Sequence, residues 1–119
     1  MDYMDYKDVW LNFEGRISRS EFWLKGFLPI FVINLLISAI DSVITGGLIA
    51  ALVSIVLIYP SVAIGVKRFH DRNKSGWWVL ITLIPVIGWI WYLVECGILQ
   101  GSAGNNDYGP DPEQANPEN

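Results

Sequence analysis

The positions of the basic residues constrain the fold of this chain more than any other feature of its sequence. All eight Lys and Arg residues lie in two clusters, at positions 7–25 and 67–74. The residues between the clusters carry a single charge, on Asp41. Basic residues concentrate in the cytoplasmic loops of membrane proteins. The pattern therefore predicts an integral membrane protein in which an even number of membrane crossings separates the two clusters.

Three apolar segments are long enough to cross a bilayer as helices, because a hydrocarbon core of about 30 Å needs roughly 20 apolar residues. They cover about residues 22–43, 46–66 and 77–99. Only 17% of all residues are charged, whereas soluble domains average roughly 25%. We therefore predict an all-α membrane protein with three transmembrane helices, a cytoplasmic N-terminus and an extracytoplasmic C-terminus.

Local signals indicate where these helices begin and turn. Ser18 and Glu21 have the spacing of a capping box, which predicts that the first transmembrane helix begins near Arg19. Residues 45–47, Thr-Gly-Gly, predict a tight turn between the first two helices. Ser75 is a candidate N-cap for the third apolar segment.

The third segment contains two residues that interrupt helices. Pro85 and Gly88 are expected to bend one transmembrane helix or, as the alternative, to split the segment into a re-entrant pair. Residues 1–112 are expected to form a single membrane domain. The sequence from residue 101 onward is rich in Gly, Asn, Pro and acids, which predicts disorder apart from a local turn within residues 106–112. Residues 113–119 are expected to be a disordered tail.

Aromatic residues ahead of the first transmembrane segment recur with helical spacing. They fall on one face of a helix and are Tyr3, Tyr6, Trp10 and Phe13. We predict a short amphipathic helix that lies on the membrane surface. The alternative is a frayed acidic terminus.

The predicted functional face is the cytoplasmic one, where the basic clusters meet two tryptophans. We expect this face to bind anionic lipid, which attracts each basic residue with about 1 kcal/mol, or to bind partner proteins. The alternative is that the basic residues only determine topology. The residues assigned to this face are Arg16, Arg19, Lys67, Arg68, His70, Asp71, Arg72, Trp77 and Trp78.

His70 and Asp71 allow a second interpretation, as a metal site or an acid–base pair. The chain has no other histidine, so a metal site would need Glu14, Glu21 or a second subunit to complete it. We therefore expect no metal and no cofactor. We expect Asp71 to pair with an arginine, and His70 to donate to a lipid headgroup or a backbone carbonyl.

Small and polar residues are expected to join the first two transmembrane helices, because small side chains let membrane helices approach closely. The residues assigned to this packing are Asn34, Ser38, Gly47, Ala51, Ser54, Ser61 and Gly65. The alternative is a transport or channel component in which Asn34, Asp41 and Glu95 line a path. Three helices enclose too little space for a pore, so such a component would be an oligomer.

Several function classes are disfavoured by the residues present. Cys96 is the only cysteine, so neither an intrachain disulfide nor a cysteine-based metal site is expected. The sequence contains no nucleophile-elbow, phosphate-binding-loop or zinc-protease motif. Nucleic acid is not an expected partner, because no basic surface remains once both clusters lie at a membrane.

Three ordered blocks of the sequence together resemble one known family. They are residues 13–23 (FEGRISRSEFW), residues 60–78 (with KRFHD followed by SGWW) and residues 106–112 (NDYGPDP). With these blocks, residues 13–112 are similar to the DUF805 family of small bacterial inner-membrane proteins. Lys67 stands where the family often has arginine, which keeps the charge but loses bidentate geometry. The resemblance implies a helical protein of the bacterial plasma (inner) membrane and implies no reaction.

We therefore predict a non-enzymatic membrane module that binds anionic lipid or partner proteins through its cytoplasmic basic face. A membrane protein or a second copy of the chain is the expected kind of protein partner. An oligomeric transport or channel component is the first alternative. A metal-dependent enzyme at His70 and Asp71 is the second.

Overall fold

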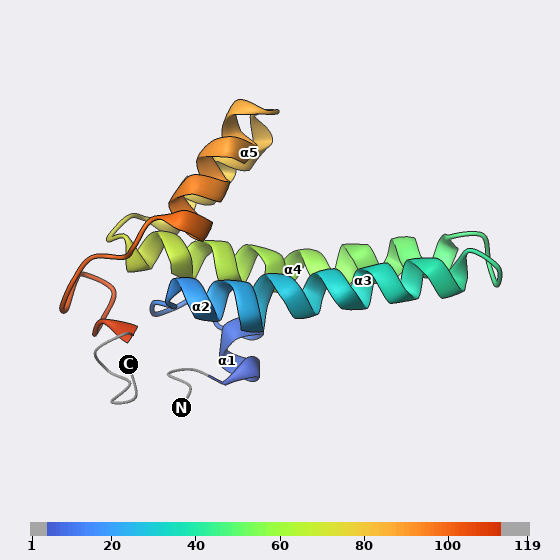
Figure 1. Ribbon diagram of the computed structural model, residues 1–119, viewed down its shortest axis with the longest axis horizontal. Coiled ribbons are helices and arrows are strands. Elements are labelled where there is room, and N and C mark those ends of the chain that lie inside the picture. The colour runs from blue at the N-terminus through green and yellow to red at the C-terminus, as the bar shows by residue number, and fades with distance from the viewer. Residues whose placement is uncertain (1–4, 113–119) are drawn as a thin grey trace.

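The computed structural model describes residues 5–112, which form helices and connecting segments with no β-strand among them. Two long helices lie side by side, and a shorter helical arm projects from one end of the pair (Figure 1). The elements in chain order are α1 (Tyr6–Leu11), α2 (Arg19–Glu21), the π-helix η1 (Phe22–Phe27), α3 (Leu28–Asp41), α4 (Leu48–Asp71), the 3₁₀ helix η2 (Gly76–Leu83), α5 (Ile87–Tyr92) and the π-helix η3 (Leu93–Ile98). The predicted tail at residues 113–119 lies outside the described residues.

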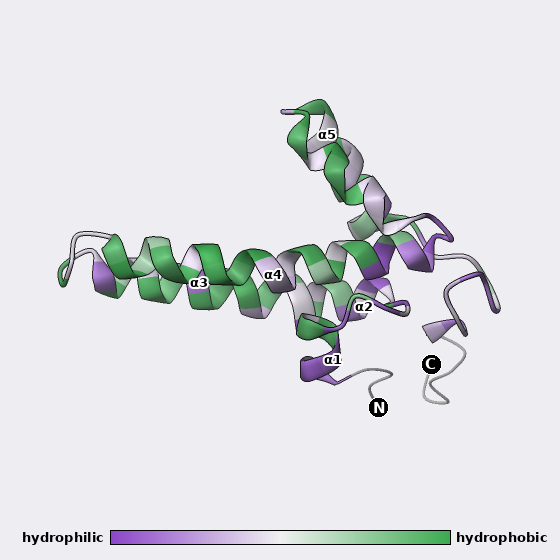
Figure 2. Cartoon of the chain, turned by 180° about the vertical axis from the view of Figure 1, so that it is seen from behind, coloured by the Kyte–Doolittle hydropathy of each residue, from purple (hydrophilic) through white to green (hydrophobic). Residues whose placement is uncertain are grey.

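Two helices are long and apolar enough to cross a membrane. The first runs continuously from α2 through η1 and α3, Arg19–Asp41, and the second is α4, Leu48–Asp71. Only 11% and 33% of their most apolar windows are buried inside the protein. Apolar residues therefore cover the outer surface of both helices (Figure 2), whereas the core helix of a soluble protein would bury them.

The first long helix begins and ends as the sequence predicts. Ser18 is its N-cap, and Ser18 and Glu21 form the predicted capping box. At the other end, Asp41 accepts a hydrogen bond from Thr45 Oγ1 at 2.6 Å and from the backbone N–H of Ala50 at 3.0 Å. Asp41 thus satisfies donors of the turn and of the first turn of α4, which would otherwise lack partners. The turn joining α3 to α4 is confirmed.

Polar contacts between α3 and α4 centre on Asn34. Its side-chain amide donates to Ser54 Oγ at 3.2 Å, and its carbonyl accepts from Ser38 Oγ at 3.3 Å. These contacts lie within the apolar part of the pair, nearer to the turn than to the basic end. Interhelical hydrogen bonds of this kind join membrane helices because lipid offers no competing partner.

The remaining residues assigned to packing are spread over different environments. Gly47 lies in the turn with φ of 115°, and a Cβ there would meet no atom within 4 Å. Ala51 is exposed. Ser61 donates to the backbone of its own helix. Gly65 faces the arm, because a Cβ there would lie 2.9 Å from the hydroxyl of Tyr92.

The third apolar segment forms no helix long enough to cross a membrane, so the described residues contain two candidate transmembrane helices and the prediction of three is wrong. The helix η2 ends at Leu83, the chain turns at residues 84–86, and α5 and η3 run back beside η2 (Figure 1). Val86 adopts φ of 64° in this turn. Pro85 disfavours helical backbone at the residue before it, so the segment folds into two halves, each too short to cross. We refer to residues 76–98 as the arm.

The turn of the arm depends on close backbone approach. A Cβ on Gly88 would lie 1.8 Å from the carbonyl oxygen of Ile81. Trp89 Nε1 also donates to the carbonyl of Thr82 at 3.0 Å. The re-entrant alternative for Pro85 and Gly88 is therefore the arrangement that the structure has.

The helix α1 packs against the protein at the end of the pair from which the arm projects. Val9 is fully buried, and Trp10 Nε1 donates to the carbonyl of Lys25 at 2.8 Å. In an α-helix the carbonyl of Lys25 would accept from the backbone N–H of residue 29, but Pro29 has no N–H. A short N-terminal helix is confirmed, but Tyr6 is half exposed and Tyr3 lies outside the described residues.

Replacing Gly88 by alanine should destabilise the arm. The added Cβ overlaps a backbone oxygen that has no freedom to move aside, and overpacking of this kind costs about 1–3 kcal/mol. We expect Gly88→Ala to lower the free energy of unfolding, measured by denaturant titration in mild micelles, by about that amount. The exposed neighbour Ile87→Ala is the control. Equal stability of Gly88→Ala and the parent would contradict the arm's turn.

Candidate functional site

The basic end of the helix pair is built on one buried carboxylate between two buried arginines. Asp71, at the end of α4, accepts from Arg16 Nε at 2.9 Å through Oδ1 and from Arg68 Nη1 at 2.5 Å through Oδ2. The exposed fractions are 2% for Asp71 and 0% for both arginines. Burying a charge is costly unless it is paired and hydrogen-bonded. The predicted pairing of Asp71 with an arginine is therefore confirmed, with Arg16 and Arg68 as partners.

The two arginines also bind backbone carbonyls from both ends of the chain. Arg68 donates to the carbonyls of Ile17 at 3.0 Å, Cys96 at 2.6 Å and Leu99 at 2.7 Å. The last two carbonyls end η3, where a helix leaves carbonyls without intrahelical donors. Arg16 donates to the carbonyls of Ser102, Gly104 and Gly109. Each guanidinium thus joins segments that are far apart in the sequence.

Contrary to the expected disorder, residues 101–112 pack against this ion-pair cluster. Ser102 donates its backbone N–H to the carbonyl of Asp71 at 2.8 Å, and Asn106 donates its amide to the carbonyl of His70 at 2.9 Å. A Cβ on Gly101 would lie 1.9 Å from Oδ2 of Asp71, so only glycine fits there. The turn predicted within residues 106–112 is present at Asn106–Gly109.

Lys67 and His70 are likewise engaged with the protein itself. The ammonium group of Lys67 donates to the carbonyls of Asp8, Val9 and Asn12 at 2.5–2.6 Å, which satisfies the last turn of α1. An ammonium group has three protons, and this arrangement uses all of them. His70 Nδ1 lies 2.9 Å from the carbonyl oxygen of Gly15. A backbone carbonyl was one of the two partners predicted for His70, the other being a lipid headgroup.

Arg72 and Lys74 form a second, more accessible cluster with Glu95. Arg72 Nε donates to Oε2 of Glu95 at 2.7 Å, and Lys74 Nζ contacts Oε1. Burial alone would raise the pKa of Glu95, but the hydrogen bonds from Lys74 and Arg72 and their charges lower it below its ordinary value. Glu95 therefore remains ionised at neutral pH and holds both cations at the base of the arm.

The other residues assigned to the basic face have different exposures. Arg19 donates to the carbonyl of Ile98 at 3.0 Å on the surface. Trp77 is 77% exposed, whereas Trp78 is 40% exposed and stacks on Phe69. The structure therefore brings all nine assigned residues to one end, but it buries five of them: Arg16, Lys67, Arg68, His70 and Asp71.

The residues of the transport alternative are not brought together. Asp41 lies at the turn between α3 and α4, Glu95 lies at the opposite end beside Arg72, and Asn34 lies between them, bonded to Ser54. Within residues 5–112 no three His, Cys, Asp or Glu side chains are placed to hold a metal ion.

Sequence reasoning missed the contribution of the C-terminal segment. Ser102, Gly104 and Gly109 act through backbone carbonyls, which no side-chain pattern identifies. The available signal was the third resemblance block, residues 106–112, which contains Asn106 and Gly109. All three blocks meet at the ion pairs of Asp71.

Comparisons with known proteins agree with this resemblance. Residues 10–110 match the family described as "Protein of unknown function (DUF805)". The chain is 33% identical over 116 residues to "Inner membrane protein YhaH" of Escherichia coli K12, which covers 93% of this chain and 95% of that protein. It is 32% identical over 117 residues to "Inner membrane protein YhaI" of the same strain, covering 93% and 94%. No solved structure matches the chain.

Removing the charge of Asp71 should destabilise the protein more than removing any exposed carboxylate. Asp71→Asn preserves side-chain volume but removes the carboxylate that pairs with the buried Arg68, and it leaves Arg16 with only Asp111, at 4.0 Å. Breaking a buried pair in this way costs about 3–5 kcal/mol. We expect a loss of that order in the free energy of unfolding in micelles. The exposed Asp107→Asn is the control and should change it by less than about 0.5 kcal/mol. Equal effects of the two substitutions would show that the buried ion pairs do not hold this end together.

Proposed function

Because the chain belongs to the DUF805 family, whose function is unknown, we propose its function from its own residues: a non-enzymatic inner-membrane module whose cytoplasmic end binds anionic lipid. The names of the relatives support the location, and two outward-facing apolar helices support insertion in a bilayer. We propose that the module catalyses no reaction, because His70 contacts a backbone carbonyl and Asp71 pairs with arginines of the protein itself.

The orientation follows from the basic residues. Both basic clusters lie at the end of the helix pair that carries the arm, because the residues between them form the two crossings and the turn. The cytoplasmic side of a membrane protein carries the excess of Lys and Arg. We therefore place this end in the cytoplasm. Residues 99–112 pack against Arg16 and Asp71 at the same end. We therefore propose that they are cytoplasmic as well, in place of the extracytoplasmic C-terminus expected from three crossings.

One observation carries the proposed lipid binding: half of the basic residues remain accessible at this end. Arg16, Lys25, Lys67 and Arg68 are buried, with exposed fractions of 0–6%. Lys7 is exposed, Arg19 is half-buried, and the side chains of Arg72 and Lys74 are 26% and 30% exposed. Accessible cations beside the exposed Trp77 match a membrane surface, where tryptophan prefers the interface and anionic lipid attracts cations.

Reporter fusions at Asn119 test the orientation. We expect a fused green fluorescent protein to fluoresce and a fused alkaline phosphatase to be inactive, because the arm does not cross the membrane. Reporters inserted between Gly46 and Gly47, in the turn at the other end, are the control and should give the opposite result. An active phosphatase at Asn119 would mean that a third crossing exists.

Lipid retention tests the binding. We expect purified protein in mixed-lipid bilayers to retain phosphatidylglycerol in preference to phosphatidylcholine in native mass spectrometry. The preference should weaken as salt rises, because exposed charges are screened beyond about 10 Å at 0.1 M salt. If the lipids retained by the protein show no headgroup preference, the accessible cations serve only topology and internal ion pairs.

A further inference from the structure

The base of the arm combines a pair of cations with an apolar groove. We propose that Arg72 and Lys74 bind the phosphate of one anionic phospholipid whose acyl chain lies in this groove, an assignment that rests on the proposed function and gives it a specific site. The groove has a volume of about 500 Å³ and is lined by Ile87, Ile90, Trp91, Val94, Glu95 and Leu99.

The cation pair has charge and donors left for a ligand. Glu95 supplies one negative charge against the two positive charges of Arg72 and Lys74, which leaves a local charge of about +1 at neutral pH. Nε and Nη1 of Arg72 donate within the protein, to Glu95 and to the carbonyl of Gln100, and one contact of Lys74 is with Glu95. A guanidinium has five N–H donors and an ammonium has three, so both side chains retain donors for a phosphate.

The groove continues directly from these cations. Glu95 belongs to the groove lining and is also the partner of Arg72 and Lys74. The apolar lining residues Ile87 and Ile90 are 68% and 59% exposed, so nothing in the described chain covers them. The lining residues of α5 and η3 recur at spacings of three and four, which places them along one face of the arm.

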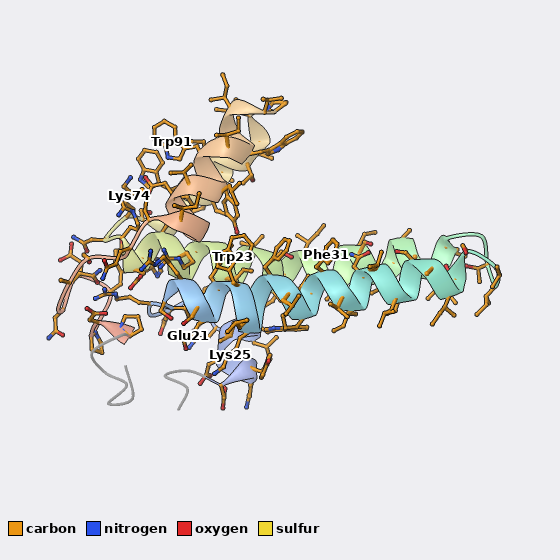
Figure 3. The ribbon with its side chains drawn as sticks, in the orientation of Figure 1. Glu21, Trp23, Lys25, Phe31, Lys74 and Trp91 are labelled. Atoms are coloured by element: carbon orange, nitrogen blue, oxygen red, sulfur yellow. The ribbon has the colours of Figure 1, made fainter. Side chains whose placement is uncertain are left out.

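Two tryptophans lie between the charged and apolar parts of the site. Lys74 Nζ lies 5.0 Å from the centroid of the Trp78 ring, and Trp78 stacks on Trp91 at 6.1 Å between centroids. Lys74 and Trp91 lie on the same flank of the arm (Figure 3). Tryptophan favours the level of the lipid headgroups. The order cation, tryptophan, apolar groove therefore matches the order headgroup, interface, acyl chain along a phospholipid.

This order selects phospholipid over other anionic ligands. Inorganic phosphate would bind Arg72 and Lys74 but leave the groove empty. The acidic side chains of a peptide would bind the same cations but leave the apolar surface of the groove uncovered. A zwitterionic lipid fits the groove but carries no net charge to complement the cations. An anionic phospholipid satisfies both parts at once.

Native mass spectrometry with phosphatidylglycerol and phosphatidylcholine tests the site. Arg72→Gln with Lys74→Gln should lower phosphatidylglycerol affinity roughly 25-fold, since each cation contributes about 1 kcal/mol, or about fivefold. Lys7→Gln with Arg19→Gln removes the same charge from the same end and should have a much smaller effect. Glu95→Gln should raise affinity roughly fivefold, because it releases both cations. A gain of this kind cannot arise from misfolding.

Groove variants distinguish a phospholipid from phosphate alone. Ile90→Ser with Val94→Ser should weaken phosphatidylglycerol binding but leave binding of inorganic phosphate unchanged. If the parent prefers phosphatidylglycerol but both double cation variants lose it equally, the site is wrong and the proposed function stands. If the parent has no headgroup preference, the proposed function itself fails. Loss of affinity in Glu95→Gln would likewise overturn the site, because it would give the cluster a structural role only.

Discussion

The buried ion pairs of Asp71 with Arg16 and Arg68 are the interaction on which the rest of the basic end of the helix pair depends. A buried arginine that is left unpaired carries a large desolvation cost. Their remaining donors therefore bind the carbonyls of residues 17, 96, 99, 102, 104 and 109. These contacts fix where the arm ends relative to α4, and they hold the C-terminal segment against the helix pair. The accessible cations at Arg72 and Lys74 are positioned by the same framework.

Local sequence signals predicted the helix pair well, because each boundary depends on residues close together in the chain. The capping box at Ser18 and Glu21 and the turn after Asp41 are of this kind. The third apolar segment was misassigned because length and hydropathy are the same for a crossing helix and for a folded hairpin. Its outcome depends on the approach of Gly88 to the backbone of Ile81. That contact is visible only once the arm is folded.

The sequence predicted which residues gather at the candidate site but not which of them are buried. The sequence correctly placed the basic residues at one end, yet it treated all of them as a surface. Burial separates them into two groups: Arg16, Lys67 and Arg68 bind the protein's own backbone, whereas Arg72 and Lys74 retain exposure. The difference arises because Arg16 and Arg68 each donate to three backbone carbonyls of segments that are distant in the sequence and that cover them, whereas Arg72 donates to one such carbonyl, that of Gln100. No spacing rule in the sequence reveals such partners.

The length of chain between these partners has a consequence for biosynthesis. Arg16 is separated by 55 residues from Asp71 and by 93 residues from Gly109, both of which it contacts in the folded protein. Arg16 therefore leaves the ribosome long before either partner exists, and it must stay hydrated at the membrane surface while the two helices insert. During that interval its charge can direct insertion. The same guanidinium can bind the carbonyl of Gly109 only after that residue has been synthesised, so the packing of the C-terminal segment against Arg16 is a late event in folding.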